Sequence, residues 1–224
     1  MAVRPVNMVE GEFYHVYNRG TDKRLMFRDN TDYQRFIKLL YISNSVARVN
    51  VRDILRKNKE PYAYKRGAPL VSIGAYCLMP NHFHLLLTPT IDGGVSMFMH
   101  RLCTGYSMYF NRRYNRTGTL LEGPFKSSWV DNDTYLKYLY AYIHLNPLHL
   151  WKREDIDEEI TNEETLDFLK SYVYSSLPDY LKVSRAENII VNPKPFPQYF
   201  ETVSDQVSEL KEWLLLREEQ ELIK

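Results

Sequence analysis

The sequence predicts an α+β fold of the ferredoxin-like, split βαβ type: an antiparallel sheet with helices on one face, as in palm and RNA-recognition folds. The first observation behind this prediction is the order of segments in residues 12–146, which is strand, helix, strand, strand, helix, strand, helix. The second is periodicity, because strand-like segments are short and apolar or alternating, whereas helix-like segments repeat apolar residues every three or four positions.

The first strand and helix are predicted near the start of the chain. Residues 12–20 alternate, are rich in aromatic side chains and end at Gly20. Asp29 and Thr31 are suitable helix caps, and apolar residues follow at positions 33, 36, 37 and 40. We therefore expect a helix from about Thr31 to the late forties.

The second and third strands are predicted at Leu70 to Met79 and His82 to Thr88, with Pro80 and Asn81 forming the bend between them. The sequence Asp-Gly-Gly at 92–94 indicates a turn before the second helix. That helix is expected over Val95 to Tyr114, because apolar and aromatic residues recur there at helical spacing.

A last short strand is predicted at 124–130 and a third helix at about Tyr135 to Asn146. The polar run 131–134 offers N-caps for this helix, and Pro147 is expected to fix its end, because proline disfavours helix at the residue before it. Beyond Leu150, helices are expected near 161–172 and 207–223, separated by a proline-rich connector.

Charge divides the chain into two parts. Residues 1–130 carry 19 Lys and Arg against 9 Asp and Glu, whereas residues 131–224 carry 10 against 19. A basic body favours a polyanionic partner. We therefore expect a domain at 1–150, with a basic insert at about 48–66, and an acidic helical extension at 151–224.

Composition excludes several classes of protein. The apolar fraction of 44% argues against global disorder. No apolar stretch approaches the roughly 20 residues that span a bilayer, and the first residues lack a signal-peptide core. The expectation is a protein that binds no membrane and lies in the cytoplasm, associated with the nucleoid if DNA is its partner.

His82 and His84 are the first candidate functional residues. They are one residue apart in a predicted strand, so both project from the same face, about 7 Å apart along the strand, while Phe83 points into a core. Two imidazoles placed in this way form half of a divalent-metal site. Alone, the pair is weak evidence, since short strands present two histidines by chance.

Tyr142 and Asn146 strengthen the hypothesis. They lie four residues apart and share one helix face. A metal held by His82, His84 and the Asn146 side-chain oxygen keeps its full charge, because all three ligands are neutral, and Tyr142 can then attack a bound phosphate. Many tyrosines crowd this helix, so most of them are expected to serve packing.

Three segments resemble the signature blocks of the single-tyrosine HUH transposases: residues 14–20 (YHVYNRG), 79–86 (MPNHFHLL) and 142–147 (YIHLNP). The similarity is greatest to the REP-associated tyrosine transposases, because Asn146 stands where the insertion-sequence branch usually has glutamine. Residues 122–127 and 172–177 also resemble that branch. One departure is Pro124, where such proteins commonly carry arginine.

The resemblance implies a function and site residues. His82 and His84 would be metal ligands for Mg²⁺ or Mn²⁺, with Asn146 as the third ligand. Tyr142 would be the nucleophile that forms a 5′-phosphotyrosine link to single-stranded DNA beside hairpins of REP-like palindromes. The protein would act as a monomer or homodimer in transposition, as a nuclease and strand transferase.

Basic residues are expected to contact DNA phosphates as a group. The candidates are Arg19, Arg48, Arg52, Arg56, Lys57, Arg112, Arg113, Arg116 and Lys126.

Two other readings remain open. A non-catalytic DNA- or RNA-binding domain of the same fold would read single strands by aromatic stacking, and it predicts aromatic residues where this chain has His82 and His84. A domesticated regulator would bind palindromes without cleaving them.

Overall fold

The computed structural model describes residues 8–57, 60–151, 162–199 and 202–222. The strands are β1 (Phe13–Arg19), β2 (Val71–Met79), β3 (His82–Pro89) and β4 (Lys126–Val130). The helices are α1 (Asn30–Ile42), α2 (Val51–Lys57), α3 (Gly94–Arg113), α4 (Asp133–Leu145), α5 (Asn162–Ser171), α6 (Leu177–Tyr180) and α7 (Val203–Leu222). None of the described helices is long and apolar enough to cross a membrane.

The four strands form one sheet in the order β2-β3-β1-β4, and every neighbouring pair is antiparallel. This is the strand order of the split βαβ fold, so the predicted fold class is confirmed. The turn at Pro80 and Asn81 joins β2 directly to β3, as the sequence predicts. β4 is shorter than expected and begins at Lys126.

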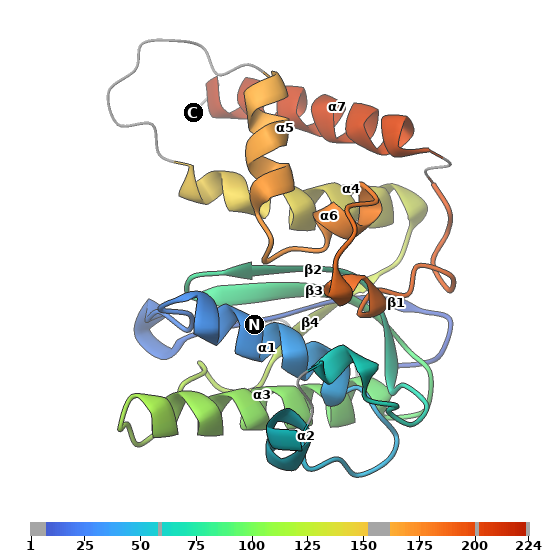
Figure 1. Cartoon of the computed structure of the whole chain (residues 1–224). Helices are drawn as coiled ribbons and strands as arrows, with labels where there is room; N and C mark the ends of the chain where they lie inside the picture. Colours follow the sequence, from blue (N-terminus) through green and yellow to red (C-terminus); the bar gives the residue numbers. More distant parts are fainter. Residues whose placement is uncertain (1–7, 58–59, 152–161, 200–201, 223–224) are drawn as a thin grey trace.

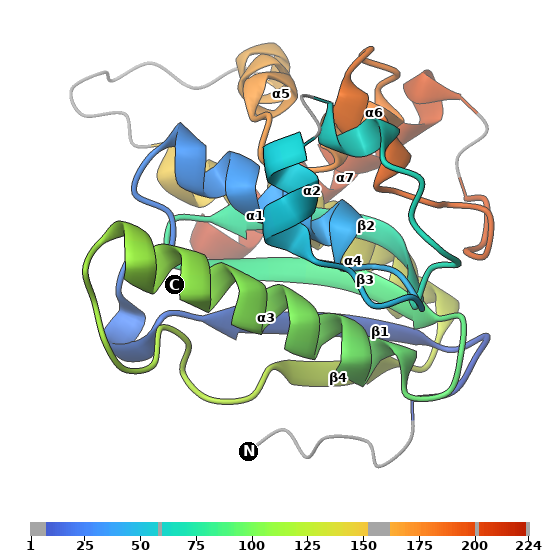
Figure 2. The ribbon, with the colours of Figure 1, turned by 60° about the horizontal axis from the view of Figure 1, so that its bottom comes forward.

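Helices α1 and α3 cover one face of the sheet (Figure 2). Alternation along the strands makes this possible, since Val16 of β1 and Phe83 and Leu85 of β3 point to the same side. They pack there against buried residues such as Phe36 of α1 and Phe98 of α3. This layer is the main core of the protein.

Helix α4 lies on the opposite face of the sheet (Figure 1). Leu139 and Ile143 pack there against Ala75 and Cys77 of β2 and Leu86 of β3. The expectation of helices on one face therefore holds for α1 and α3 and is wrong for the third helix. The physical reason is that β2 is buried over its whole length, so apolar side chains on both of its faces need cover.

The first helix ends earlier than predicted. Helix α1 stops at Ile42, because Asn44 uses its side chain to hold the start of β2. Its Oδ1 accepts hydrogen bonds from the Leu70 and Val71 amides, and its Nδ2 donates to the Val71 carbonyl. The basic insert accordingly contains a separate short helix, α2, rather than an extension of α1.

The third helix begins where the polar run predicts. The Asn132 side chain accepts a hydrogen bond from the Tyr135 amide and caps α4. The helix ends at Leu145 and the chain continues as a 3₁₀ turn over Asn146–Leu150, with Pro147 in its first positions. Proline is compatible with this place because the first amides of a helix have no partner within it.

Helices α5 and α7 lie on the side of α4 away from the sheet, and the short helix α6 lies beside α4 (Figure 1). Ala141 and Leu145 of α4 meet Leu169, Leu177 and Leu210 in a third cluster of buried residues. Helix α4 is therefore enclosed between the sheet and the C-terminal helices.

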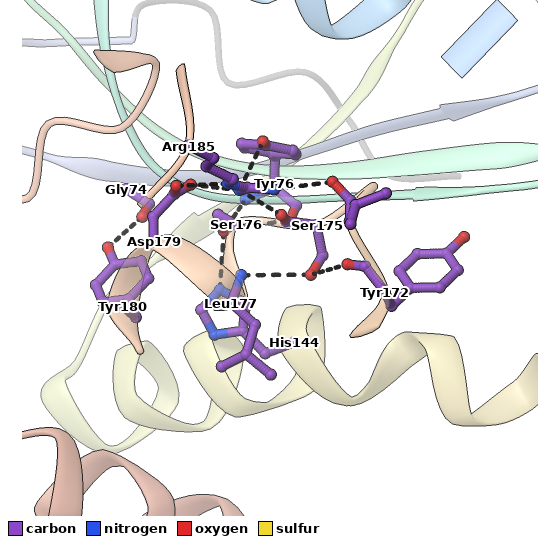
Figure 3. Close-up of polar contacts among 11 residues, drawn as sticks. Gly74, Tyr76, His144, Tyr172, Ser175, Ser176, Leu177, Asp179, Tyr180 and Arg185 are labelled. Carbon is purple, nitrogen blue, oxygen red and sulfur yellow. Dashed lines mark hydrogen bonds and ion pairs between the residues drawn. The ribbon is translucent and has the colours of Figure 1, made fainter. Parts of the chain in front are cut away.

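The segment between α5 and α6 covers the free edge of β2 (Figure 3). The Leu78 amide donates to the Tyr174 carbonyl, and the Ser176 amide donates to the Tyr76 carbonyl. The hydroxyl of Ser176 also accepts from the Tyr76 amide at 2.9 Å. The open edge of β2 is thus paired, as exposed strand edges usually must be.

Candidate metal centre and nucleophile

His82 and His84 lie on the face of the sheet that α4 covers. They are residues 1 and 3 of β3, and their ring centroids are 5.0 Å apart with the rings nearly perpendicular. His84 is buried, with 6% of its surface exposed, and His82 is half-buried. Both imidazoles project from the same side of β3, as the sequence predicts.

A neighbour engages one nitrogen of each imidazole. His82 Nδ1 lies 2.7 Å from Asn81 Oδ1, and His84 Nδ1 lies 2.9 Å from His15 Nε2. Asn81 Oδ1 can only accept, so His82 donates from Nδ1 and its Nε2 carries the lone pair. Burial lowers the pKa of His82 and lowers that of His84 to about 2, so both rings are neutral at pH 7.

Helix α4 and its 3₁₀ extension bring Tyr142 and Asn146 to this pair. The Tyr142 ring stands 5.3 Å from the His84 ring at an interplanar angle of 79°. Asn146 is buried, and its Nδ2 donates to the Tyr142 carbonyl at 3.0 Å, so Oδ1 is its remaining acceptor. A side-chain hydrogen bond with Asn146 opposes the effect of burial on the pKa of His82. The structure therefore brings all four predicted residues together.

This donor set fits a divalent cation. Two neutral imidazoles and an amide oxygen can each offer a lone pair, and their other polar atoms are held by the protein. Among the described residues no group of three or more His, Cys, Asp and Glu could hold a metal. Asn146 is what completes the candidate centre.

Sequence reasoning missed two residues of the site, His15 and Tyr17. Both lie on β1 beside β3, where Tyr17 pairs with His84 in the register. Their rings are 5.0 Å and 5.9 Å from the ring of His84. The sequence did contain a signal for them. Side chains alternate along β1, so His15 and Tyr17 lie on the face opposite to Val16.

His144 points away from the candidate centre. Its Nε2 lies 2.8 Å from the Ser176 hydroxyl, and it is almost completely buried (Figure 3). Burial lowers the pKa of His144 to about 3, so the ring is neutral. The residue links α4 to the segment that covers β2.

Four of the predicted DNA-binding arginines, Arg19, Arg56, Arg113 and Arg116, have protein partners. Arg19 forms a two-point ion pair with Glu122, although it also lies beside His82 in the register. Arg113 pairs with Asp29 and with the fully buried Asp32.

Arg116 donates to Asn111 at 3.1 Å and lies over the Phe110 ring. Lys126 is exposed on β4, where it pairs in register with Tyr17.

The other basic residues gather far from Tyr142, on the side of α1 and α3. Arg52 and Arg112, together with Arg35 and Arg113, line a cavity of about 570 Å³. Arg48, Arg56 and Lys57 are exposed on or near α2, and Arg56 pairs with Asp53. The structure does not bring these residues to the candidate metal centre.

Two histidines of the antiparallel sheet thus face a tyrosine-bearing helix, an arrangement suited to metal-assisted attack of a tyrosine on a phosphate. The sequence profile described as "Transposase IS200 like" matches residues 31–146. The chain belongs to this IS200-like transposase family.

The fold is similar to a solved structure described as a REP-associated tyrosine transposase bound to a REP hairpin. The TM-score is 0.51 at 12% sequence identity, and the match covers 84% of this chain and 90% of that chain. No curated protein matches the sequence.

Proposed function

We propose that this chain is a metal-dependent single-strand DNA endonuclease and strand transferase that cleaves beside DNA hairpins and forms a covalent link through Tyr142. The observation that carries the proposal is the approach of Tyr142 to the histidine pair, with ring centroids 5.3 Å apart at His84. Membership of a transposase family supports it. The hairpin bound to the structural neighbour supports the choice of DNA.

Each residue has a role in this proposal. His82, His84 and Asn146 would hold Mg²⁺ or Mn²⁺, which when bound would polarise the scissile phosphate and offset its charge. The Tyr142 phenol releases its proton to water as its oxygen bonds to phosphorus, and the bond from phosphorus to the 3′-oxygen breaks. The 5′-phosphate stays on tyrosine, and the 3′-oxygen leaves as a hydroxyl after taking up a proton.

The rest of the site orients and shields this chemistry. Tyr142 is half-buried between the rings of His84 and Tyr138, 5.3 and 5.8 Å away, which restricts the phenol to few orientations. Because Tyr142 and His84 come from the same chain, one copy is sufficient to build the centre. We therefore favour a monomer over a homodimer that shares its sites.

A labelled hairpin oligonucleotide with single-stranded flanks tests the proposal. In Mn²⁺ the protein should form an adduct that survives denaturing electrophoresis, and Tyr142→Phe should form none. Tyr138→Phe is the matched control, because it alters a phenol one turn away on the same helix and should keep the adduct. EDTA should abolish the adduct. An adduct formed by Tyr142→Phe would remove that residue from the role, and hairpin binding without any adduct would favour the regulator.

The cavity between α1, α2 and α3 is the best supported place for DNA phosphates. Arg35, Arg52 and Arg112 have no ion-pair partner among the residues that the structure describes. The Nε of Arg35 is buried without a hydrogen-bond partner there. Guanidinium groups that lack a carboxylate partner and line one cavity favour the binding of an anion such as a phosphate.

Salt dependence of hairpin binding tests this placement. Arg52→Gln with Arg112→Gln should weaken binding and reduce the slope of log K against log salt by about 2, since each phosphate contact contributes about 0.9. The matched control is Arg56→Gln, because Arg56 already pairs with Asp53. An unchanged slope in the double variant would place the DNA elsewhere.

A further inference from the structure

His15 lies directly behind the metal ligand His84. Its Nε2 is 2.9 Å from His84 Nδ1, and the two rings are stacked with centroids 5.0 Å apart at 26°. The side chain is buried, with 8% of its surface exposed. This contact has no counterpart at His82, whose Nδ1 faces the amide oxygen of Asn81 instead.

The same residue also touches the nucleophile. The ring of His15 meets that of Tyr142 edge to face, with centroids 5.9 Å apart, and lies 4.9 Å from the ring of Tyr17. Its strand, β1, is central and hydrogen-bonded on both sides, by β3 and β4. His15 is thus held on a rigid element and contacts both a metal ligand and Tyr142.

The hydrogen bond decides which nitrogen of His84 can bind a cation. A neutral imidazole has one N–H and one lone pair. If His84 carries its proton on Nδ1, it donates to His15 Nε2 and presents the lone pair of Nε2. In most proteins the acceptor behind a metal-binding histidine is a carboxylate, a carbonyl or water. Here a second imidazole occupies that place.

We infer that His15 is a positioning residue that accepts a hydrogen bond from His84 Nδ1–H and fixes the tautomer and ring orientation in which His84 Nε2 faces the metal site. The inference rests on the proposed function, because it concerns the same metal centre. A neutral acceptor adds no negative charge to the site, so the charge of the bound cation stays directed at the phosphate. The edge contact with Tyr142 couples the position of the nucleophile to that of the ligand.

Mn²⁺ binding to the full-length protein without DNA tests the inference, by isothermal titration and by the electron paramagnetic resonance signal of free Mn²⁺. His15→Phe keeps a ring of similar shape but cannot accept, and it should weaken binding 10- to 100-fold, the usual effect of losing such a partner. His15→Gln can accept through Oε1 and should stay within about threefold of the wild type. His84→Ala should abolish binding.

The outcomes separate this inference from the proposed function. Wild-type affinity in His15→Phe, with binding lost in His84→Ala, would overturn the role of His15 and leave the metal centre intact. Equal losses in the Phe and Gln variants would show that packing matters rather than the hydrogen bond, and would also overturn it. A wild-type protein that binds no Mn²⁺ would overturn the metal centre and the inference with it.

Nitrogen NMR of the histidine side chains gives a reading that does not depend on whether a variant folds. With saturating Mg²⁺, wild-type His84 should carry its proton on Nδ1. A proton on Nε2 would overturn the inference directly.

Discussion

Replacing Arg185 should destabilise the protein strongly, although the residue lies far along the chain from the core strands. Its guanidinium donates to both carboxylate oxygens of Asp179, at 2.7 and 2.5 Å (Figure 3). It also donates to the carbonyls of Ser175 and Val173 and to the Tyr76 hydroxyl. The side chains of the ion pair are only 11% and 3% exposed.

The size of the effect follows from burial. Desolvation raises the pKa of Asp179 even though Arg185 opposes the shift, so the carboxylate remains costly to bury while it is paired. Arg185→Met leaves that carboxylate without its cation, which typically costs about 3–5 kcal/mol. Removing both charges, in Asp179→Leu with Arg185→Met, should recover about 2 kcal/mol of that loss, because no unpaired charge remains.

Urea unfolding followed by far-UV circular dichroism measures these differences at pH 7. The single variant should show a lower midpoint at an unchanged slope, and the double variant should lie between it and the wild type. A double variant less stable than Arg185→Met would refute the reasoning. That result would mean that the unpaired charge of Asp179 does not cause the loss of stability. The lost hydrogen bonds from Arg185 to the two carbonyls and the Tyr76 hydroxyl would then be the cause.

Three further predictions concern His144, Asp32 and Trp213. The folded-state pKa of His144, about 3, lies below its unfolded value near 6.5, so its stabilising effect is complete above pH 6.5 and is lost as the pH falls toward 3. Between pH 7 and 5 the wild type should therefore lose about 2 kcal/mol more unfolding free energy than His144→Gln, and parallel profiles would contradict this. Asp32→Asn should cost about 3 kcal/mol in urea unfolding, because Asp32 is fully buried and paired with Arg113; a loss below 1 kcal/mol would contradict it. Trp213→Ala removes an edge contact with Tyr138 at 5.1 Å and should lower stability by about 1–3 kcal/mol while leaving Mn²⁺ affinity unchanged; a large loss of Mn²⁺ binding would show that α7 shapes the metal centre.

Much of the site could be predicted because it depends on local spacing. The pair His82 and His84 needs only the alternation of a strand, and Tyr142 and Asn146 need only the pitch of a helix. Their meeting depends on which face of the sheet receives α4, and the prediction of helices on one face was wrong at this point. The placement of α4 is decided by the apolar residues of β2 on both faces, together with the C-terminal helices.

The parts that could not be predicted depend on side chains that act over long distances in sequence. The side chain of Asn44, two residues after the end of α1, bonds to the backbone of residues 70 and 71. Helix propensities do not contain this long-range interaction. Arg113 looks like a free cation at the end of a basic helix, yet it neutralises the buried Asp32 across 81 residues. The contact between His15 and His84 joins two strands 69 residues apart.

Helix α4 is packed on two sides, which limits how far it could move during DNA cleavage and rejoining. The helix contributes side chains to two separate clusters, one against the sheet and one against α5 and α7. Swinging it outward would expose both to water at once, which is an expensive rearrangement. If Tyr142 carries a covalently bound DNA end, as proposed above, that DNA end rather than helix α4 would have to move between cleavage and rejoining.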